Sequence, residues 1–188
     1  MKLEEKYLQG MNYSTYKKLV EHQAKNGLTS GPNQTDDYIN YTKLNYQRMK
    51  RAEKTYPVSI DAIETDLIYW LIVTETWCGD AAQAIPVIEK LAALFKAKTK
   101  YLLRDENLDV IDQFLTNGNR SIPKLILMTK EFEAKASWGP SPAAAKALQL
   151  DYKNGKYASK DAYKRDLQAY YNENKGADTI GEIVPLLA

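Results

Sequence analysis

The chain has 188 residues, of which 44% are hydrophobic and 27% charged, a profile typical of one globular, water-soluble domain. Its formal net charge of +2 at pH 7 excludes a general electrostatic attraction to nucleic acid or to an anionic membrane. A single cysteine, Cys78, excludes an intramolecular disulfide and fits a reducing compartment. The sequence lacks an apolar run of roughly 20 residues, and its first residues lack the apolar stretch of a secretion signal. We therefore expect a cytoplasmic protein.

Residues 1–57 are expected to form a helical N-terminal extension. Ser14 is a suitable N-cap for a helix that runs to about Lys25 and stops at an Asn-Gly pair. A longer helix is expected from about Asp36 to Glu53, ahead of Pro57, because the residue before a proline disfavours helical backbone. One side of this second helix carries Tyr41, Leu44, Arg48 and Ala52.

Residues 58–145 alternate between strand and helix patterns and are expected to form the core. The nearly continuous apolar run 66–74 is typical of a strand buried on both faces. The remaining predicted elements are a helix at 80–98, a strand at 99–105, a helix at 108–118 and an antiparallel strand pair, 124–130 and 131–138, with almost no turn between them. The first helix has an apolar face of Ile85, Ile88, Leu91, Ala92 and Phe95. This order predicts an α/β fold in which helices flank a mixed sheet.

Residues 146–188 are expected to be a helical C-terminal extension that packs on the core, so that the whole chain is one folded unit. Tyr163, Tyr170 and Tyr171 fall at helical spacing ahead of a stop at Lys175-Gly176. Packing of these tyrosines against the core is the simpler interpretation. A tyrosine-rich groove for a partner is the alternative.

The chemistry of the sequence is concentrated in Trp77-Cys78-Gly79, which lies between the buried strand and the first core helix. A cysteine at a helix start faces unpaired backbone N–H groups and the positive end of the helix dipole. Both favour the thiolate, which is the nucleophilic form of cysteine. Asp80, two residues later, opposes this effect because its carboxylate disfavours a second negative charge nearby.

This segment resembles the active site of the thioredoxin family. A strand, Trp77-Cys78-Gly79 and a helix interrupted by Pro86 occur in the order found in that family, and Ile122-Pro123 is similar to its cis-proline element. Trp138-Gly139 falls where a thioredoxin leaves its last strand. The helical extensions are similar to those of a poorly characterised bacterial group of thioredoxin-like proteins. The resemblance implies a thioredoxin-like fold in which Ile122 and Pro123 position a substrate backbone over the sulfur, beside Trp77 and Gly79.

The sequence departs from the thioredoxin pattern at three positions. Ala81 occupies the place of the second, resolving cysteine, and Ile72 that of the buried acid of the active-site strand. Asp80 stands where proline is common. Without a resolving thiol, a mixed disulfide on Cys78 must be released by an external thiol. These departures argue against disulfide reduction of the thioredoxin type.

Other candidate sites are weaker. Asp105, Glu106, Asp109 and Asp112 form an acidic group, which fits a solvated face better than a metal site. His22, the single histidine, lies far from Cys78 in sequence, so neither a zinc site nor a Cys–His pair is expected. We expect no metal and no bound cofactor.

The sequence leads to two main hypotheses about function. The first is monothiol exchange, in which Cys78 attacks the disulfide or oxidised sulfur of a protein or of a low-molecular-weight thiol compound. The second is a redox-inactive module that binds a peptide or protein partner in the groove around Trp77 and Pro123. Carriage of an iron–sulfur cluster between two subunits ranks last, because no glutathione-binding motif is visible. Neither nucleic acid nor a membrane is an expected partner, and the oligomeric state is open.

Overall fold

The computed structural model describes residues 3–188 and contains one four-stranded sheet within that range. The strands are β1 (Tyr69–Thr74), β2 (Lys98–Leu103), β3 (Lys124–Met128) and β4 (Ala134–Trp138). The α-helices are α1 (Leu3–Gln9), α2 (Tyr13–Asn26), α3 (Asp36–Thr55), α4 (Gly79–Leu94), α5 (Leu108–Ile111), α6 (Ala143–Lys153), α7 (Lys160–Asn174) and α8 (Ala177–Ile183). Two 3-10 helices, η1 (Arg104–Glu106) and η2 (Val184–Leu187), complete the described elements.

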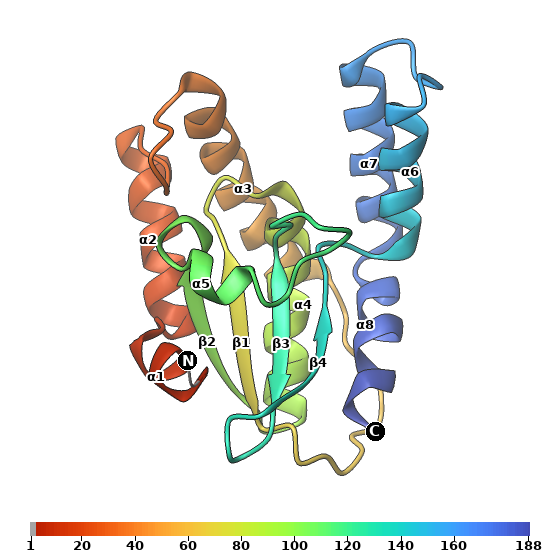
Figure 1. The fold of residues 1–188 in the computed structure, drawn as a ribbon. Coiled ribbons are helices and arrows are strands. Elements are labelled where there is room, and N and C mark those ends of the chain that lie inside the picture. Colours follow the sequence, from red (N-terminus) through yellow and green to blue (C-terminus); the bar gives the residue numbers. More distant parts are fainter. Residues whose placement is uncertain (1–2) are drawn as a thin grey trace.

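The sheet has the strand order β2-β1-β3-β4. β1 is parallel to β2 and antiparallel to β3, and β3 is antiparallel to β4. The α/β class with a mixed sheet is therefore confirmed. β1 is buried along almost its whole length because it is a central strand with helices on both sides of the sheet (Figure 1), which explains its nearly continuous apolar sequence.

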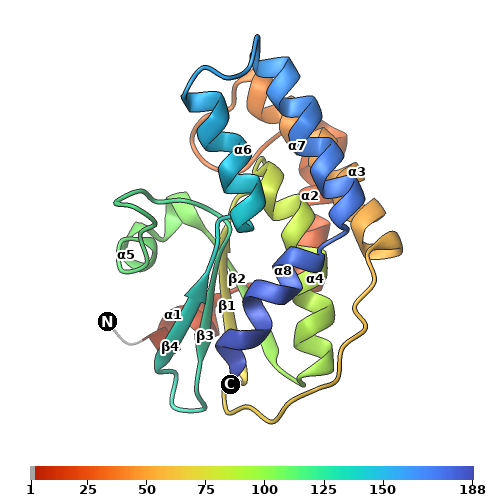
Figure 2. The ribbon, with the colours of Figure 1, turned by 90° about the vertical axis from the view of Figure 1, so that its right-hand side faces the viewer.

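The helices before β1 and after β4 stand on either side of the carboxyl end of β1. In Figure 1, α3 rises on one side of that end and the α6–α7 hairpin on the other. After a 90° turn, α4 and α8 lie side by side on one face of the sheet, with the α6–α7 hairpin above them (Figure 2). The start of α4 is thus enclosed by segments from both ends of the chain.

The predicted apolar face of α4 is confirmed, since Ile85, Ile88, Leu91, Ala92 and Phe95 are all buried. Glu182 of α8 fastens the C-terminal helices to the sheet, because its carboxylate accepts hydrogen bonds from Trp138 Nε1 at 2.7 Å and from Ala143 N at 2.6 Å. The second of these bonds occupies a free amide at the start of α6.

The predicted N-cap of α2 is wrong by two residues. Asn12, not Ser14, precedes the helix, and its side chain accepts a hydrogen bond from Thr15 N at 2.8 Å. Asn is at least as good an N-cap as Ser, and its position here reaches the amide three residues on. The predicted stop is confirmed, because Gly27 ends α2 in left-handed backbone with φ of 67°.

The helix expected over 108–118 is also wrong, since α5 ends at Ile111. Asn117 and Gly118 both have positive φ, 50° and 74°, and form a tight turn in which Thr116 and Asn119 exchange backbone hydrogen bonds. An Asn-Gly pair favours a hairpin turn of this kind. The pair therefore marks a hairpin rather than the end of a helix.

The expected strand boundaries need two smaller corrections. β1 begins at Tyr69 rather than at residue 66, and a turn at 129–133 separates β3 from β4, where almost none was expected. In that turn Phe132 has a positive φ of 60°, and its ring stacks on Tyr69 with centroids 4.5 Å apart. Burial of this aromatic pair accounts for the longer turn.

The side of α3 that carries Tyr41, Leu44, Arg48 and Ala52 is only partly buried. Ala52 is buried, but the other buried residues of this helix are Thr42, Asn45 and Met49. Tyr41, Leu44 and Arg48 line a cleft that also contains Cys78. Within residues 3–188, no helix combines the length and apolar character needed to cross a membrane.

The corrected N-cap gives a direct test of the fold. We expect Asn12→Ala to lower the free energy of unfolding by about 1 kcal/mol, because the Thr15 amide loses its partner. Ser14→Ala is the matched control and should change it by less than about 0.5 kcal/mol, since Ser14 is exposed inside the helix. Urea denaturation measures both. Equal losses in the two variants would contradict the assignment of Asn12.

Candidate functional site

Cys78 lies between β1 and α4 and is the residue immediately before the first turn of α4. Its side chain is almost enclosed, with 7% of the residue exposed. The thiol donates a hydrogen bond to the carbonyl oxygen of Ile122, with Sγ and O 3.3 Å apart. Ile122 is joined to the buried Pro123 by a cis peptide bond. The structure thus brings together two segments that are 44 residues apart in sequence.

Burial decides the protonation of this thiol. It raises the pKa of Cys78 to about 12, and the nearby charge of Asp80 acts in the same direction. The backbone amides of Ala81 and Asp80, together with Arg104, lower the pKa by a smaller amount. Desolvation therefore outweighs the helix terminus at Cys78. The thiolate expected from the helix start stays a prediction, and the balance of these effects argues against it.

Asp80 joins the active-site helix to the C-terminal helices. Its Oδ1 accepts a hydrogen bond from the Tyr171 hydroxyl of α7 at 2.7 Å. Burial raises the pKa of Asp80, while the Tyr171 bond and the charge of Arg48 lower it. The predicted influence of Asp80 on Cys78 is thus present in the structure and disfavours ionisation of the thiol.

Arg48 extends from α3 toward the same helix start. Its Nη1 donates to Asn45 Oδ1 at 3.2 Å, and a Cβ placed on Gly79 would lie 3.4 Å from that Nη1. Within residues 3–188, the buried Nε of Arg48 has no hydrogen-bond partner. Burial lowers the pKa of this guanidinium, and Asp80 opposes the shift. A Cβ at position 79 would thus meet the end of the Arg48 side chain at ordinary van der Waals distance.

Trp77 is half-buried beside the thiol. Its ring packs at a tilt against Tyr38, with centroids 4.8 Å apart, and the Arg104 guanidinium carbon lies 5.1 Å from the Trp77 ring centre. A cation over an aromatic face at this distance is attractive. Trp77 thus links the core to α3 through Tyr38 and to η1 through Arg104.

Glu75 is an acid near the site that sequence reasoning missed. The carboxylate is fully buried, accepts hydrogen bonds from the Ser30 hydroxyl and from Asp105 N, and has a pKa that burial raises. Ile72, where thioredoxins carry their acid, is an apolar core residue with no exposed surface. The sequence feature that could have revealed this buried acid is the position of Glu75 directly after an apolar strand. Because two donors hold Glu75, its first role is to fix the loop of Ser30 against the end of β1.

These residues border one cleft of about 680 Å³. The core contributes the segment from Trp77 to Asp80 and the loop 119–122. α3 supplies one wall and the α6–α7 hairpin the other, on either side of the carboxyl end of β1 (Figure 1). The structure therefore places all the predicted site residues except Pro123 in the lining of this cleft, and adds Arg48, Tyr163 and Tyr171 to it.

The other candidate groups lie elsewhere. Asp105, Asp109 and Asp112 form ion pairs with Arg104, Lys6 and Arg120. His22 is exposed and adjoins Asn26 of its own helix. In the described part of the chain, no group of three His, Cys, Asp or Glu side chains is arranged to hold a metal ion.

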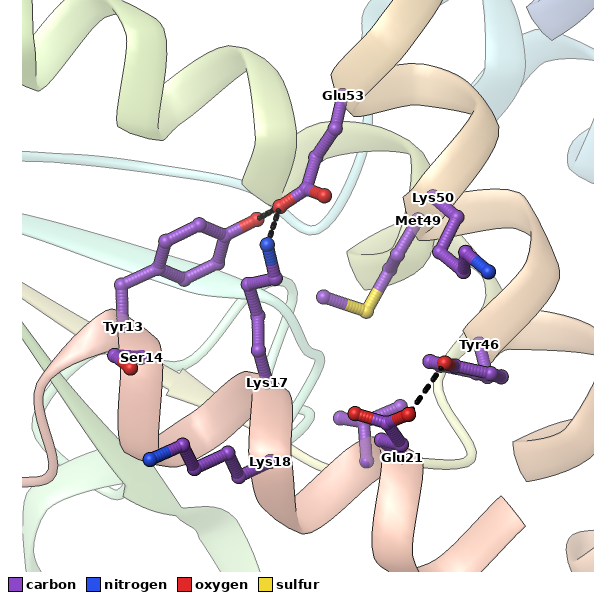
Figure 3. A pocket seen from close by; sticks show the side chains of 10 residues that line it. Tyr13, Ser14, Lys17, Lys18, Glu21, Tyr46, Met49, Lys50 and Glu53 are labelled. Atoms are coloured by element: carbon purple, nitrogen blue, oxygen red, sulfur yellow. Dashed lines mark hydrogen bonds and ion pairs between the residues drawn. The ribbon is translucent and has the colours of Figure 1, made fainter. Parts of the chain in front are cut away.

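A second cavity, of about 440 Å³, lies between α2 and α3. Figure 3 shows Tyr13 and Lys17 both directed at Glu53, and Tyr46 at Glu21. These interactions join the two helices, and the cavity has no features of a reaction site.

Comparison with known proteins relates this fold to one family and to two solved structures. A family model described as thioredoxin matches residues 31–154. The crystal structure of an HIV epitope scaffold is similar at 16% identity and a TM-score of 0.64, covering 99% of this chain and 97% of that chain. A protein of unknown function from Pseudomonas aeruginosa is similar at 18% identity and a TM-score of 0.44, covering 88% of this chain and 93% of that chain. No curated protein matches the chain.

At such low identity the similarity to the scaffold concerns the fold alone. The family match has more weight, because it covers more than half of the chain and includes all four strands, Cys78 and Pro123. The thioredoxin-like fold with additional terminal helices is thereby confirmed, and the chain belongs to the thioredoxin family.

Proposed function

We propose that this chain is a thioredoxin-fold binding protein, which accepts a ligand in the cleft over Cys78 without turning over its thiol. The observation that carries the proposal is the cleft itself, about 680 Å³ in volume and walled jointly by the core, α3 and the α6–α7 hairpin. Sites for small ligands are typically concave and between about 300 and 1,000 Å³.

The state of Cys78 supports binding over exchange. Its sulfur is almost enclosed, and burial raises its pKa to about 12, so very little thiolate is present at neutral pH. The thiol already donates its hydrogen bond within the protein, to the Ile122 carbonyl. Ala81 offers no second thiol to release a mixed disulfide.

Monothiol exchange is the second candidate, and the contacts of the sulfur favour it. The backbone amides of Asp80 and Ala81, together with Arg104, lower the pKa of the thiol. In that reaction a Cys78 thiolate attacks a disulfide, a mixed disulfide forms and one thiolate leaves. An external thiol then attacks the mixed disulfide and regenerates Cys78. Electrons come from that external thiol.

Three expectations from the sequence stay predictions. They are the division of the chain into an N-terminal extension (1–57), a core (58–145) and a C-terminal extension (146–188), the identity of a protein or small-thiol partner, and a cytoplasmic location. The proposal depends on none of them, because the lining of the cleft is defined by its residues.

The rate of alkylation of Cys78 against pH separates the two functions. We expect iodoacetamide to react slowly at pH 7 and the rate still to be rising at pH 9, because burial holds the thiol protonated. Cys78→Ser is the control for modification of other residues. A midpoint below about 7 would contradict the binding proposal and favour exchange.

Asp80 gives a test based on stability. Burial raises the pKa of Asp80 in the folded protein, so the unfolded chain loses its proton first as pH rises, and this carboxylate then destabilises the fold. Asp80→Asn removes that loss while an amide oxygen still accepts from Tyr171. We expect the stability of the variant relative to the original protein to increase between pH 4 and pH 7, measured by urea denaturation.

Asp112→Asn is the control of opposite sign. Arg120 lowers the pKa of Asp112, so its contribution to stability is present at pH 7 and is lost as pH falls through the folded pKa. This variant should therefore lose stability relative to the original protein as pH rises from about 2 to about 4, and its relative stability should change little above pH 4. The same pH trend in both variants would show that Asp80 does not titrate as a buried group.

A further inference from the structure

The charge of the cleft lining differs from that of the chain as a whole. The whole chain is nearly balanced, with 26 basic and 24 acidic residues. The lining contains one carboxylate, Asp80, against six cationic side chains: Arg48, Arg104, Arg120, Lys153, Lys160 and Lys164. Such a concentration of one sign in a concave, partly desolvated site raises the local concentration of ligands of opposite charge.

Two of the six cations are already neutralised. Arg104 pairs with Asp105 at 2.7 Å, and Arg120 forms two hydrogen bonds with Asp112, at 2.6 and 2.8 Å. For the other four, no ion pair occurs among residues 3–188. These four are Arg48 of α3, Lys153 at the end of α6, and Lys160 and Lys164 of α7. The unneutralised charge therefore comes from both walls of the cleft.

Arg48 is the strongest reason to expect an anion. Within the described chain its buried Nε lacks a partner, and buried polar groups rarely remain unpaired in proteins. Asp80 does not supply that partner, because its carboxylate accepts a hydrogen bond from Tyr171 and no ion pair joins it to Arg48. Because Arg48 lines the cleft, an incoming carboxylate or phosphate would form charge-assisted hydrogen bonds with its guanidinium.

The walls between the cations are aromatic and apolar. Tyr38, Tyr41, Trp77 and Tyr163 all line the cleft, and Lys164 Nζ lies 5.2 Å from the ring centre of Tyr41. A site with apolar walls and a few convergent polar groups suits a small molecule.

We infer that the ligand of the cleft is a small molecule with two or more carboxylate or phosphate groups, one held by Arg48 and another by the lysines of the α6–α7 hairpin. This inference rests on the proposed binding function and names the class of its ligand. Asp80 remains bonded to Tyr171 while the anion is held, and the aromatic side chains contact the uncharged part of the molecule.

Calorimetry with the full chain tests this ligand class. Pyrophosphate and citrate are the probes for the phosphate and carboxylate alternatives, and triethyl citrate is the neutral counterpart of citrate. We expect at least one of the two anions to bind, triethyl citrate not to bind, and the anion affinity to fall as salt is added. The tighter of the two anions identifies the anionic group that the cleft prefers.

Two single substitutions locate the anion. Arg48→Gln should weaken its binding about tenfold or more, because a charge-assisted hydrogen bond is lost. Arg51→Gln is the matched control on the same helix, since Arg51 is exposed and outside the cleft lining, and it should change the affinity less than about twofold. If Arg48→Gln does not fold, the triple variant Lys153→Gln, Lys160→Gln, Lys164→Gln should still weaken binding several-fold.

Three results would overturn the inference. The first is binding that Arg48→Gln and Arg51→Gln weaken equally, which would indicate only a general effect of net charge. The second is binding of triethyl citrate or of an uncharged peptide but of neither anion, which would leave the cleft as a binding site and refute only the ligand class. The third is that none of these probes binds. A reactive Cys78 in the alkylation experiment would instead refute the proposed function, even if an anion binds.

Discussion

The enclosure of the first turn of α4 is the constraint on which the rest of this structure depends. Polar groups removed from water need partners, because each unpaired group costs free energy. Here the partners come from distant segments: Tyr171 of α7 for Asp80, the Ile122 carbonyl for Cys78, and Ser30 with the Asp105 amide for Glu75. The terminal helices are thus tied to the helix start by specific hydrogen bonds as well as by packing.

The same enclosure determines the chemistry of the thiol. Charge near a helix N-terminus is stabilised by about 0.3–1 kcal/mol, and by about 2 kcal/mol in favourable cases, while one pKa unit corresponds to about 1.4 kcal/mol. Full burial of an ionisable group shifts its pKa by up to about 3–5 units. The helix terminus therefore cannot offset the effect of burial on the pKa of Cys78, and the charge of Asp80 raises this pKa further. In the proposed function, the cysteine at the position of a thioredoxin nucleophile acts as a neutral hydrogen-bond donor to the Ile122 carbonyl.

The sequence was sufficient to predict the core. The apolar run that becomes β1, the buried face of α4 and the approach of Ile122-Pro123 to Cys78 follow local patterns or the family resemblance. The prediction of secondary structure failed at Asn117-Gly118. An Asn-Gly pair can either end a helix or form a hairpin turn, and here it forms the turn. The sequence was also insufficient where tertiary contacts decide. The sequence placed Arg48 on one side of its helix with Tyr41 and Leu44, and only the positions of the other elements show that this side lines the cleft.

The central claim is that α3, the start of α4 and the α6–α7 hairpin form one anion-binding site. Amide resonances of isotopically labelled protein, followed by NMR during a pyrophosphate titration, test it most directly. The account predicts that the amides of Arg48, Gly79 and Lys164, one from each segment, shift together with a single dissociation constant. Shifts confined to one segment, or spread with unequal affinities over surface lysines such as Lys18 and Lys50, would contradict it.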